Sequence, residues 1–157
     1  MTDRNARKGF TLIDLMIVIA ILGMLAGILI PQLLRGRLSA AEKTAVQTMK
    51  VFSTMQTLYS GDNNRFAKIS ELQAGNYLDI GADLLGQSAW DGDVVDFRKT
   101  GYDYKFVKVN DYEWRLTAKP QGWGKTGQTS FYVDESNTVR SSADANAPAG
   151  KASPPLK

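Results

Sequence analysis

The chain has 157 residues, which is enough for one compact domain of ordinary size. Its 19 Lys and Arg residues against 16 Asp and Glu residues give a formal net charge of +3, too close to neutral to indicate a nucleic-acid partner. Histidine and cysteine are both absent, which excludes disulfides, thiolate nucleophiles, imidazole bases and zinc sites built from Cys and His.

Residues 10–34 are almost wholly apolar, and Asp14 is their only charged residue. As a helix this segment would be roughly 38 Å long, compared with about 30 Å for the hydrocarbon core of a bilayer, so a membrane-spanning helix is predicted. A cleavable secretory signal is the alternative, but the run exceeds the roughly 7–15 apolar residues of such signals and no A-x-A-like site follows it. Basic residues before the segment favour a cytoplasmic N-terminus, an argument that Arg35 and Arg37 on the far side weaken.

The next segment, residues 35–60, has the pattern of an amphipathic helix continuous with the apolar one. Its apolar residues recur at steps of three and four and form one stripe: Leu38, Ala41, Ala45, Met49, Phe52, Met55 and Tyr59. Pro31 should kink the helix without ending it, because it removes only one backbone hydrogen bond. The predicted helix runs about 50 residues, roughly 75 Å, and stops at the turn residues 61–64.

The remainder reads as loop and antiparallel sheet. Residues 61–101 are predicted to hold turns and one short helix over residues 70–74, capped by Ser70. Strands are predicted at residues 102–109, 112–119, 130–134 and 138–140. Asn110 and Asp111 between the first two strands predict a two-residue hairpin turn. Residues 143–157 are rich in Pro, Ala and Ser and are predicted to be a disordered tail.

A specific pattern stands at Gly9-Phe10-Thr11-Leu12-Ile13-Asp14, where a short basic leader meets the apolar helix. It resembles the class III signal of type IV pilins and of the pseudopilins of type II secretion systems, in which Gly precedes Phe-Thr-Leu-Ile-Glu. Gly23 and Pro31 also stand where that family has a helix-loosening glycine and a proline. The resemblance is strong over about residues 8–40. Beyond them it is architectural, and implies an α+β fold in which a long N-terminal helix packs on a small C-terminal antiparallel sheet.

The resemblance also implies a life cycle and four segments. Residues 1–9 would be a leader, residues 10–34 the transmembrane and filament-core helix, residues 35–142 the soluble domain and residues 143–157 the tail. The precursor would sit in the inner membrane, where a prepilin peptidase would cut between Gly9 and Phe10 and methylate Phe10. An inner-membrane assembly platform and its ATPase would then add the subunit to a helical filament in the periplasm or on the cell surface.

Two residue choices depart from the family pattern. Asp14 stands where the family has Glu, and its shorter side chain puts in doubt its reach toward a neighbouring subunit. We expect Asp14 to act in assembly nevertheless, because an acid in a membrane span is costly unless it is paired. Gly23 and Pro31 are the other assembly candidates. The chain also lacks the C-terminal cysteine pair of many type IV pilins, so packing or an ion must hold its C-terminal region.

Three weaker patterns have more ordinary explanations. Asp91, Asp93 and Asp96 are candidate calcium ligands, although acidic turns are common, their spacing is not that of an EF-hand, and nothing suggests a saccharide cleft between them. The string 122–127 contains Gly-Lys-Thr but lacks the preceding glycine of a phosphate-binding loop. A DNA-binding face is a third possibility, although aromatic residues in a small sheet usually form its core; its residues would be Trp90, Trp114, Trp123, Lys99, Lys105, Lys108 and Lys125.

The sequence therefore predicts a non-catalytic subunit of a type IV pilus-like filament, without a cofactor unless calcium binds and without a nucleic-acid partner. The alternative within the family is a type II secretion pseudopilin. Such proteins carry an Asp-Pro-Trp-Gly motif, which residues 89–92 of this chain resemble only distantly. A third possibility is a permanently anchored periplasmic binding or sensor protein. The mature N-terminus discriminates, since such an anchor would keep residues 1–9.

Overall fold

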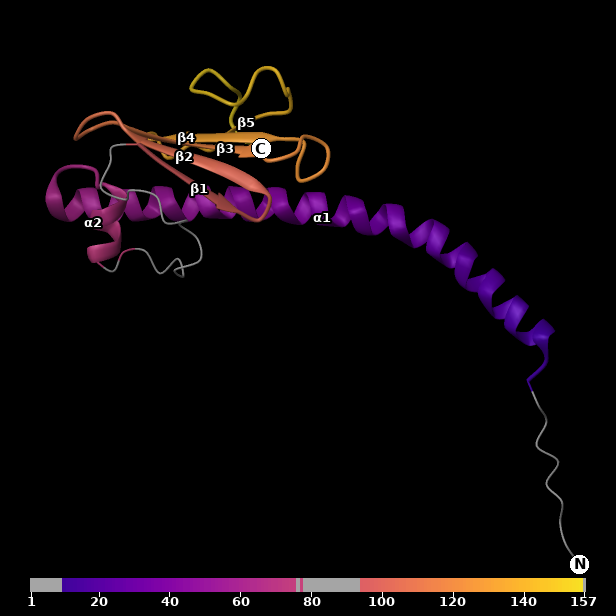
Figure 1. Ribbon diagram of the computed structural model, residues 1–157. Coiled ribbons are helices and arrows are strands. Elements are labelled where there is room, and N and C mark those ends of the chain that lie inside the picture. The colour runs from indigo at the N-terminus through magenta and orange to yellow at the C-terminus, as the bar shows by residue number, and fades with distance from the viewer. Residues whose placement is uncertain (1–9, 76, 78–93, 157) are drawn as a thin grey trace, which may run out of the picture. The chain divides into compact units, whose positions relative to one another are not determined.

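The computed structural model of the chain describes residues 10–75, 77 and 94–156 (Figure 1). Its elements in chain order are α1 (Leu12–Asn63), α2 (Ile69–Ala74), β1 (Val94–Lys99), β2 (Tyr102–Lys108), β3 (Trp114–Pro120), β4 (Ser130–Asp134) and β5 (Arg140–Ser142). The chain divides into two compact units, Met1–Gly36 and Arg37–Lys157, and α1 is a single helix that contributes to both. This architecture confirms the predicted α+β class.

Helix α1 has 52 residues, close to the predicted length, and continues through Pro31 and Gly36. It ends where the sequence predicts: Asn64 adopts a left-handed conformation with φ 53°, which stops helical propagation, and its N–H bonds the Ser60 carbonyl at 2.9 Å. Asparagine tolerates this conformation better than most residues because its short polar side chain hydrogen-bonds locally.

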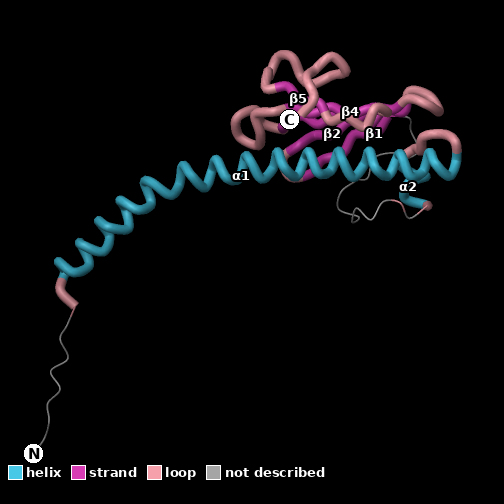
Figure 2. Tube along the Cα trace, turned by 180° about the vertical axis from the view of Figure 1, so that it is seen from behind, coloured by secondary structure: helices cyan, strands magenta, loops and turns pink. Residues whose placement is uncertain are grey.

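The five strands form one antiparallel sheet in the order β1-β2-β3-β4-β5, so each strand pairs with the next along the chain. Within the second unit this sheet lies along one side of α1 in both views (Figures 1 and 2). Tyr102, Tyr104 and Phe106 alternate along β2 and are all buried, so they form its inward face. Successive strand residues point to opposite faces, so the alternate side chains point away from α1.

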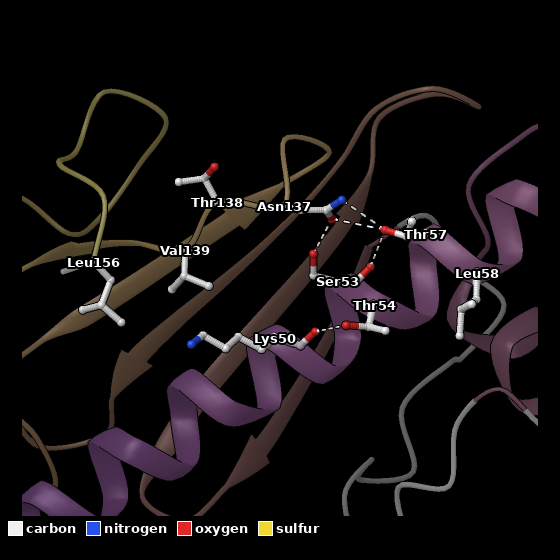
Figure 3. A pocket seen from close by; sticks show the side chains of 9 residues that line it. All are labelled: Lys50, Ser53, Thr54, Thr57, Leu58, Asn137, Thr138, Val139 and Leu156. Carbon is white, nitrogen blue, oxygen red and sulfur yellow. Dashed lines mark hydrogen bonds between the residues drawn. The ribbon is translucent and has the colours of Figure 1, made fainter.

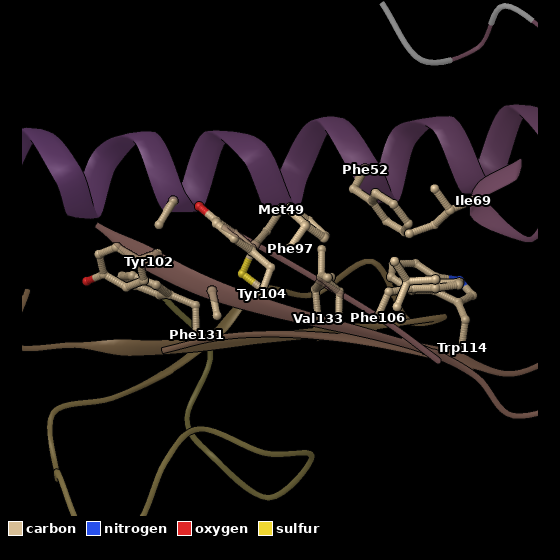
Figure 4. Packing of buried hydrophobic residues seen from close by; sticks show 14 of the residues in the cluster. Met49, Phe52, Ile69, Phe97, Tyr102, Tyr104, Phe106, Trp114, Phe131 and Val133 are labelled. Carbon is tan, nitrogen blue, oxygen red and sulfur yellow. The ribbon is translucent and has the colours of Figure 1, made fainter. Parts of the chain in front are cut away.

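The core between helix and sheet is largely aromatic (Figure 4). Phe52 of α1 lies with its ring centroid 5.1 Å from that of Phe106 and 5.6 Å from that of Trp114. Phe97 and Tyr104 stack across β1 and β2 at 4.7 Å. Five residues of the predicted helix stripe are buried and two, Leu38 and Met55, are half-buried; the buried five are Ala41, Ala45, Met49, Phe52 and Tyr59.

Polar side chains on the same face of α1 fasten it to its neighbours. The amide of Gln56 is fully buried and forms two hydrogen bonds with the backbone of Ala67, donating to the carbonyl at 3.0 Å and accepting from the N–H at 2.9 Å. Ser53 donates a hydrogen bond to the side chain of Asn137 in the turn between β4 and β5, and that amide also donates to Thr57 at 3.1 Å. These bonds hold the segment before α2 and the end of the sheet against one helix.

The same turn and α1 border a groove of about 740 Å³ (Figure 3). Its lining mixes hydroxyl, amide and apolar side chains from Lys50, Ser53, Thr54, Thr57, Leu58, Asn137, Thr138, Val139 and Leu156. The polar side chains nearest the turn already bond one another, as Figure 3 shows for Ser53, Thr57 and Asn137. We therefore interpret this end of the groove as the seam where the sheet is fastened to α1.

The structure differs from the sequence prediction in four local respects. Strand β1 was not predicted; it joins β2 through Thr100 and Gly101, both with positive φ (49° and 79°), the geometry of a tight two-residue hairpin turn. The turn between β2 and β3 covers residues 109–113 rather than Asn110 and Asp111 alone, because the Glu113 carbonyl accepts from both Val109 and Asn110. Helix α2 begins at Ile69 with Lys68 as its N-cap, so Ser70 lies inside it. The last strand is residues 140–142 instead of 138–140.

Helix α2 is held by an ion pair with Arg65, a residue of the loop after α1 that also contacts Tyr59 of α1. Both guanidinium nitrogens of Arg65 donate to the Glu71 carboxylate, at 2.6 and 2.9 Å, and one of them also donates to the Tyr59 hydroxyl at 3.0 Å. The same carboxylate accepts the Lys68 N–H at 2.8 Å. Hydrogen bonding to Arg65 lowers the pKa of Glu71 from 4.5 to about 2, against the opposing effect of its partial burial.

Residues 143–156 differ from the predicted disordered tail. Their backbone returns to the sheet, where Ala149 donates to the Ser130 hydroxyl at 2.8 Å and Leu156 donates to the Val139 carbonyl at 2.8 Å. Ala149 is buried beside Ser130 of β4. Composition misleads here because a segment with few apolar residues can still be held by backbone hydrogen bonds to an unpaired strand edge.

Candidate functional site

The candidate site is the start of α1, where the sequence places processing and assembly. Thr11 is the residue before the helix, and its hydroxyl accepts the Asp14 N–H at 3.3 Å. The Asp14 carboxylate in turn accepts the Thr11 N–H at 3.1 Å. This reciprocal pair is a capping box, which satisfies two backbone donors that the first helical turn leaves without partners.

The capping box places the Asp14 carboxylate beside the positive end of the helix dipole, on the side of Phe10. The Asp14 Oδ2 accepts the Thr11 N–H, and an ionised carboxylate has room for about four donors. The carboxylate can therefore hold its own helix end and still accept a second donor, provided that donor comes from outside this helix. The sequence signal for this arrangement is Thr11-x-x-Asp14 just before an apolar run, which is the spacing of a capping box.

The other predicted site residues lie apart from one another along the same helix. Gly23 and Pro31 are exposed positions within α1, and no atom lies within 4 Å of where a Cβ would stand on Gly23. Phe10 is exposed just before the helix, and Gly9 lies outside the described residues. The geometry thus brings Phe10, Thr11 and Asp14 together and leaves Gly23 and Pro31 as separate positions, whose assembly roles stay predictions.

The helix that carries these residues can cross a membrane by length and composition. Its most apolar window of 18 residues has a mean hydropathy of 2.8, and none of that window is buried. Every residue from Phe10 to Arg37 is exposed. These apolar side chains have no partner within the described part of the chain, which is the situation of a helix that meets lipid or other subunits.

The structure also bears on the candidate calcium ligands and on the Gly-Lys-Thr loop. Asp96 is exposed on β1, while Asp91 and Asp93 lie outside the described residues, so calcium binding stays a prediction. Within residues 10–75, 77 and 94–156, no three acidic side chains gather around a common point. The Gly-Lys-Thr loop joins β3 to β4, not a strand to a helix as in a phosphate-binding loop.

Of the two described tryptophans proposed for a DNA-binding face, Trp114 does not lie on the surface. Trp114 is only 1% exposed and belongs to the core, so it cannot stack on bases without unfolding the sheet. Trp123 is partly exposed in the loop after β3, and Trp90 lies outside the described residues. Trp114 is therefore a core residue of the sheet, which is the more ordinary explanation for an aromatic residue at this position.

Comparison with known proteins agrees with this geometry. Residues 4–30 match the model of the prokaryotic N-terminal methylation motif. Such a motif is typical of the N-terminal segment of pilins and pseudopilins, the proteins to which this chain is similar. The family's segment brackets the capping box at Phe10–Asp14, and the fold that follows it here is pilin-like: a long N-terminal helix and an antiparallel sheet.

Relatives come from both branches of that family. The type IV wide pilus major component PilA4 of Thermus thermophilus is 46% identical over 63 residues, 40% of this chain and 47% of that protein. The type II secretion system core protein G of Aeromonas hydrophila is 35% identical over 64 residues, 41% of this chain and 45% of that protein. The core protein G of Vibrio cholerae is 26% identical over 117 residues, 73% of this chain and 74% of that protein. No solved structure matches significantly.

The first two matches span less than half the length of those relatives. The homology to these two relatives therefore covers only part of each protein. Which assembly the whole chain enters is a matter of proposal.

Proposed function

We propose that this chain is a structural, non-catalytic subunit of a type IV pilus-like filament. The observation that carries the proposal is the fully exposed apolar first part of α1, most of which lies within the methylation motif at residues 4–30. Once such a helix leaves the bilayer, its apolar surface has no stable alternative to packing against copies of itself. The second unit, by contrast, has its own aromatic core and would be carried on the filament as a folded domain.

The proposed life cycle begins with a precursor in the inner membrane whose residues 1–9 lie in the cytoplasm. A prepilin peptidase would cut after Gly9 and methylate the new amine of Phe10. The assembly platform and its ATPase would then extract the subunit into a filament in the periplasm or on the cell surface. The methylation motif at residues 4–30 and the membrane-capable helix support this proposal.

Asp14 would set the register between neighbouring subunits. Cleavage creates a positive charge on Phe10, four residues before Asp14, so both charges lie at one end of an apolar rod. Within an assembled bundle, each charge alone is costly and the pair is strengthened by the low dielectric constant. Apolar helices could slide past one another, whereas a pair between the acid of one subunit and the amine of another selects one offset. An ionised carboxylate can accept several hydrogen bonds, so Asp14 can cap its own helix and still take part in that pair.

Mass spectrometry of the mature N-terminus tests the processing step. We expect the accumulated protein to begin at Phe10, and Gly9→Arg to leave the full precursor in the inner membrane, because a bulky charged side chain keeps the peptidase from the backbone. Ala6→Arg adds the same charge within the leader and serves as the control that is still cut. A mature protein that retains residues 1–9 would instead support a permanently anchored binding or sensor protein.

A type II secretion pseudopilin is the second candidate. The observation in its favour is the match to the Vibrio cholerae core protein G, which extends over 117 residues and so reaches well into the sheet. Deletion of the gene separates the two: loss of surface filaments with normal secretion supports the pilus. Loss of exported proteins from the medium, with surface filaments unchanged, supports the pseudopilin.

A further inference from the structure

The C-terminal segment pairs with the outer edge of β5, the last strand of the sheet. Ser141 donates its N–H to the Pro154 carbonyl at 3.1 Å, and Leu156 donates its N–H to the Val139 carbonyl at 2.8 Å. These two bonds form one antiparallel bridge centred on Arg140 and Pro155. The segment therefore occupies the edge that β5 would otherwise expose.

The bridge determines which way each backbone group points. In antiparallel pairing, the N–H and C=O of successive residues point alternately toward and away from the partner strand. Residues 154 and 156 bond β5, so the backbone groups of residue 155 point outward, away from the sheet. Because residue 155 is proline, this outward position offers no N–H to an incoming strand.

The other proline acts on the inner side. Residue 154 faces β5 and supplies a carbonyl to Ser141, but as a proline it has no N–H to return to the Ser141 carbonyl. The ladder therefore ends after a single bridge. Pro154 limits how tightly the segment pairs with β5, whereas Pro155 limits what can pair with the segment.

Side chains keep the segment in place despite the short ladder. Arg140 donates from its guanidinium to the Ser153 carbonyl at 3.0 Å, and Lys151 forms an ion pair with Glu135 at 3.2 Å. A local turn, in which Gly150 donates to the Ser153 hydroxyl at 3.0 Å, shapes the approach. Leu156 lies partly exposed at the border of the groove against α1.

We propose that residues 150–156 are an edge strap, which closes the β5 edge of the sheet and prevents a second copy of this chain from adding a strand there. An unprotected edge is a template for pairing with another chain, and the danger is greatest for copies held side by side in one membrane. The strap directs self-association away from the β5 edge of the sheet. This inference concerns the sheet edge alone and stands whether or not the apolar helix assembles as proposed.

Three single proline substitutions in the full chain, held in membranes, test the strap. Pro155→Thr supplies an outward N–H in a residue that favours strands, so we expect it to allow pairing between copies. Pro154→Thr supplies only an inward N–H, which should tighten the strap without allowing such pairing. Pro148→Thr changes an exposed proline of the same tail outside the bridge and is the matched control.

Two readouts separate these outcomes. The chain has no cysteine, so Ala152→Cys added to every variant gives one reactive site for a flexible bis-maleimide cross-linker. We expect several-fold more cross-linked dimer with Pro155→Thr than with the other two variants, which should match the parent. Trypsin cleavage after Lys151, followed by mass spectrometry, should be several-fold slower with Pro154→Thr. Equal cross-linking in all variants would overturn the role of Pro155, and unchanged or faster cleavage would overturn the role of Pro154.

Discussion

The two halves of helix α1 have opposite relations to their surroundings. From Phe10 to Arg37 every residue is exposed, although nearly all are apolar. From Ala41 to Tyr59 the helix carries many more polar residues, yet eight of its residues are buried. The sheet accounts for the difference, because it covers the second half along one face only.

This contrast separates two kinds of apolar surface on one helix. In the second half the apolar residues form a stripe at steps of three and four, and the chain itself provides the partner. In the first half they surround the helix, which no single neighbouring element could cover. A stripe indicates a helix that completes a domain, whereas an all-round apolar surface indicates one that belongs in lipid or in a bundle of copies.

The largest expected effect concerns assembly through the first half. We expect Asp14→Ala to leave membrane insertion and cleavage nearly intact but to reduce assembly strongly, because the register pair is lost. Asp14→Glu should assemble at least as well as the native chain, since it restores the reach of the family's residue. The measurement is the yield of sheared filaments relative to mature subunit in the membrane.

Two variants separate the charge of Asp14 from its capping role. Asp14→Asn keeps an oxygen that can accept the Thr11 N–H but removes the charge, so it should assemble as poorly as Asp14→Ala. Thr11→Ala removes the capping hydroxyl but keeps the charge, so it should assemble. A native filament yield from Asp14→Ala would show that the acid is merely tolerated.

The second half should respond to core truncation in the folded domain alone. Purified without residues 1–36, the domain should be monomeric, and Phe52→Ala should lower its free energy of unfolding by about 3–5 kcal/mol, since a buried aromatic site is emptied. Leu58→Ala, at an exposed position of the same helix, should cost no more than about 0.5 kcal/mol. Urea unfolding followed by tryptophan fluorescence measures both. A loss below about 1 kcal/mol for Phe52→Ala would contradict its place in the core.

A smaller effect should follow from the buried amide of the same face. Gln56→Leu leaves the N–H and C=O of Ala67 without their partner, at about 1–3 kcal/mol for each group that water cannot reach. Gln47→Leu, at an exposed position of α1, is the control and should change stability little. If the two variants unfold at the same urea concentration, the Gln56 amide does not hold this segment.

The smallest effect should appear only as a pH dependence. Because the pKa of Glu71 is lowered from 4.5 to about 2, its ion pair with Arg65 stabilises the domain fully above pH 4.5 and is lost as the pH falls toward 2. The free energy of unfolding of Glu71→Gln should therefore lie below that of the native domain at pH 6, and the two should converge near pH 2. Both side chains are about one-third exposed, so water screening keeps the difference modest. Curves that stay parallel to pH 2 would rule out this linkage.

The periodicity of apolar residues in the sequence was sufficient to predict most of the fold. The stripe on α1 and the alternation in β2 are strong signals because one face of each element is buried and the other is not. Strand β1 escaped prediction because its turn, Thr100-Gly101, lacks the common Asn-Gly signature, although Val95 and Phe97 alternate with charged residues. Apolar patterns also do not reveal polar residues such as Gln56, whose burial depends on a backbone partner 11 residues away.

The candidate site was predicted in composition but not in geometry. The leader, Phe10 and Asp14 can be read from the sequence because they form a motif. Asp14 can cap its own helix only because the helix begins just after Thr11. Apolar periodicity defines the exact start of a helix poorly, so this geometry could not be predicted. The tail was mispredicted for another reason. Composition indicates whether side chains can be buried, but it does not show that a backbone pairs with an open strand edge.

The simple strand order of the sheet has a consequence for how the domain folds. Because β1 to β5 pair only with their neighbours in the sequence, the whole sheet can grow from successive hairpins, each closed by a short loop. Docking on α1 requires much longer loops to close, as in the bond between Ser53 and Asn137, which are 84 residues apart. We therefore expect a preformed sheet to find a helix that the membrane already holds, so that the anchor serves as the template on which the domain completes its folding.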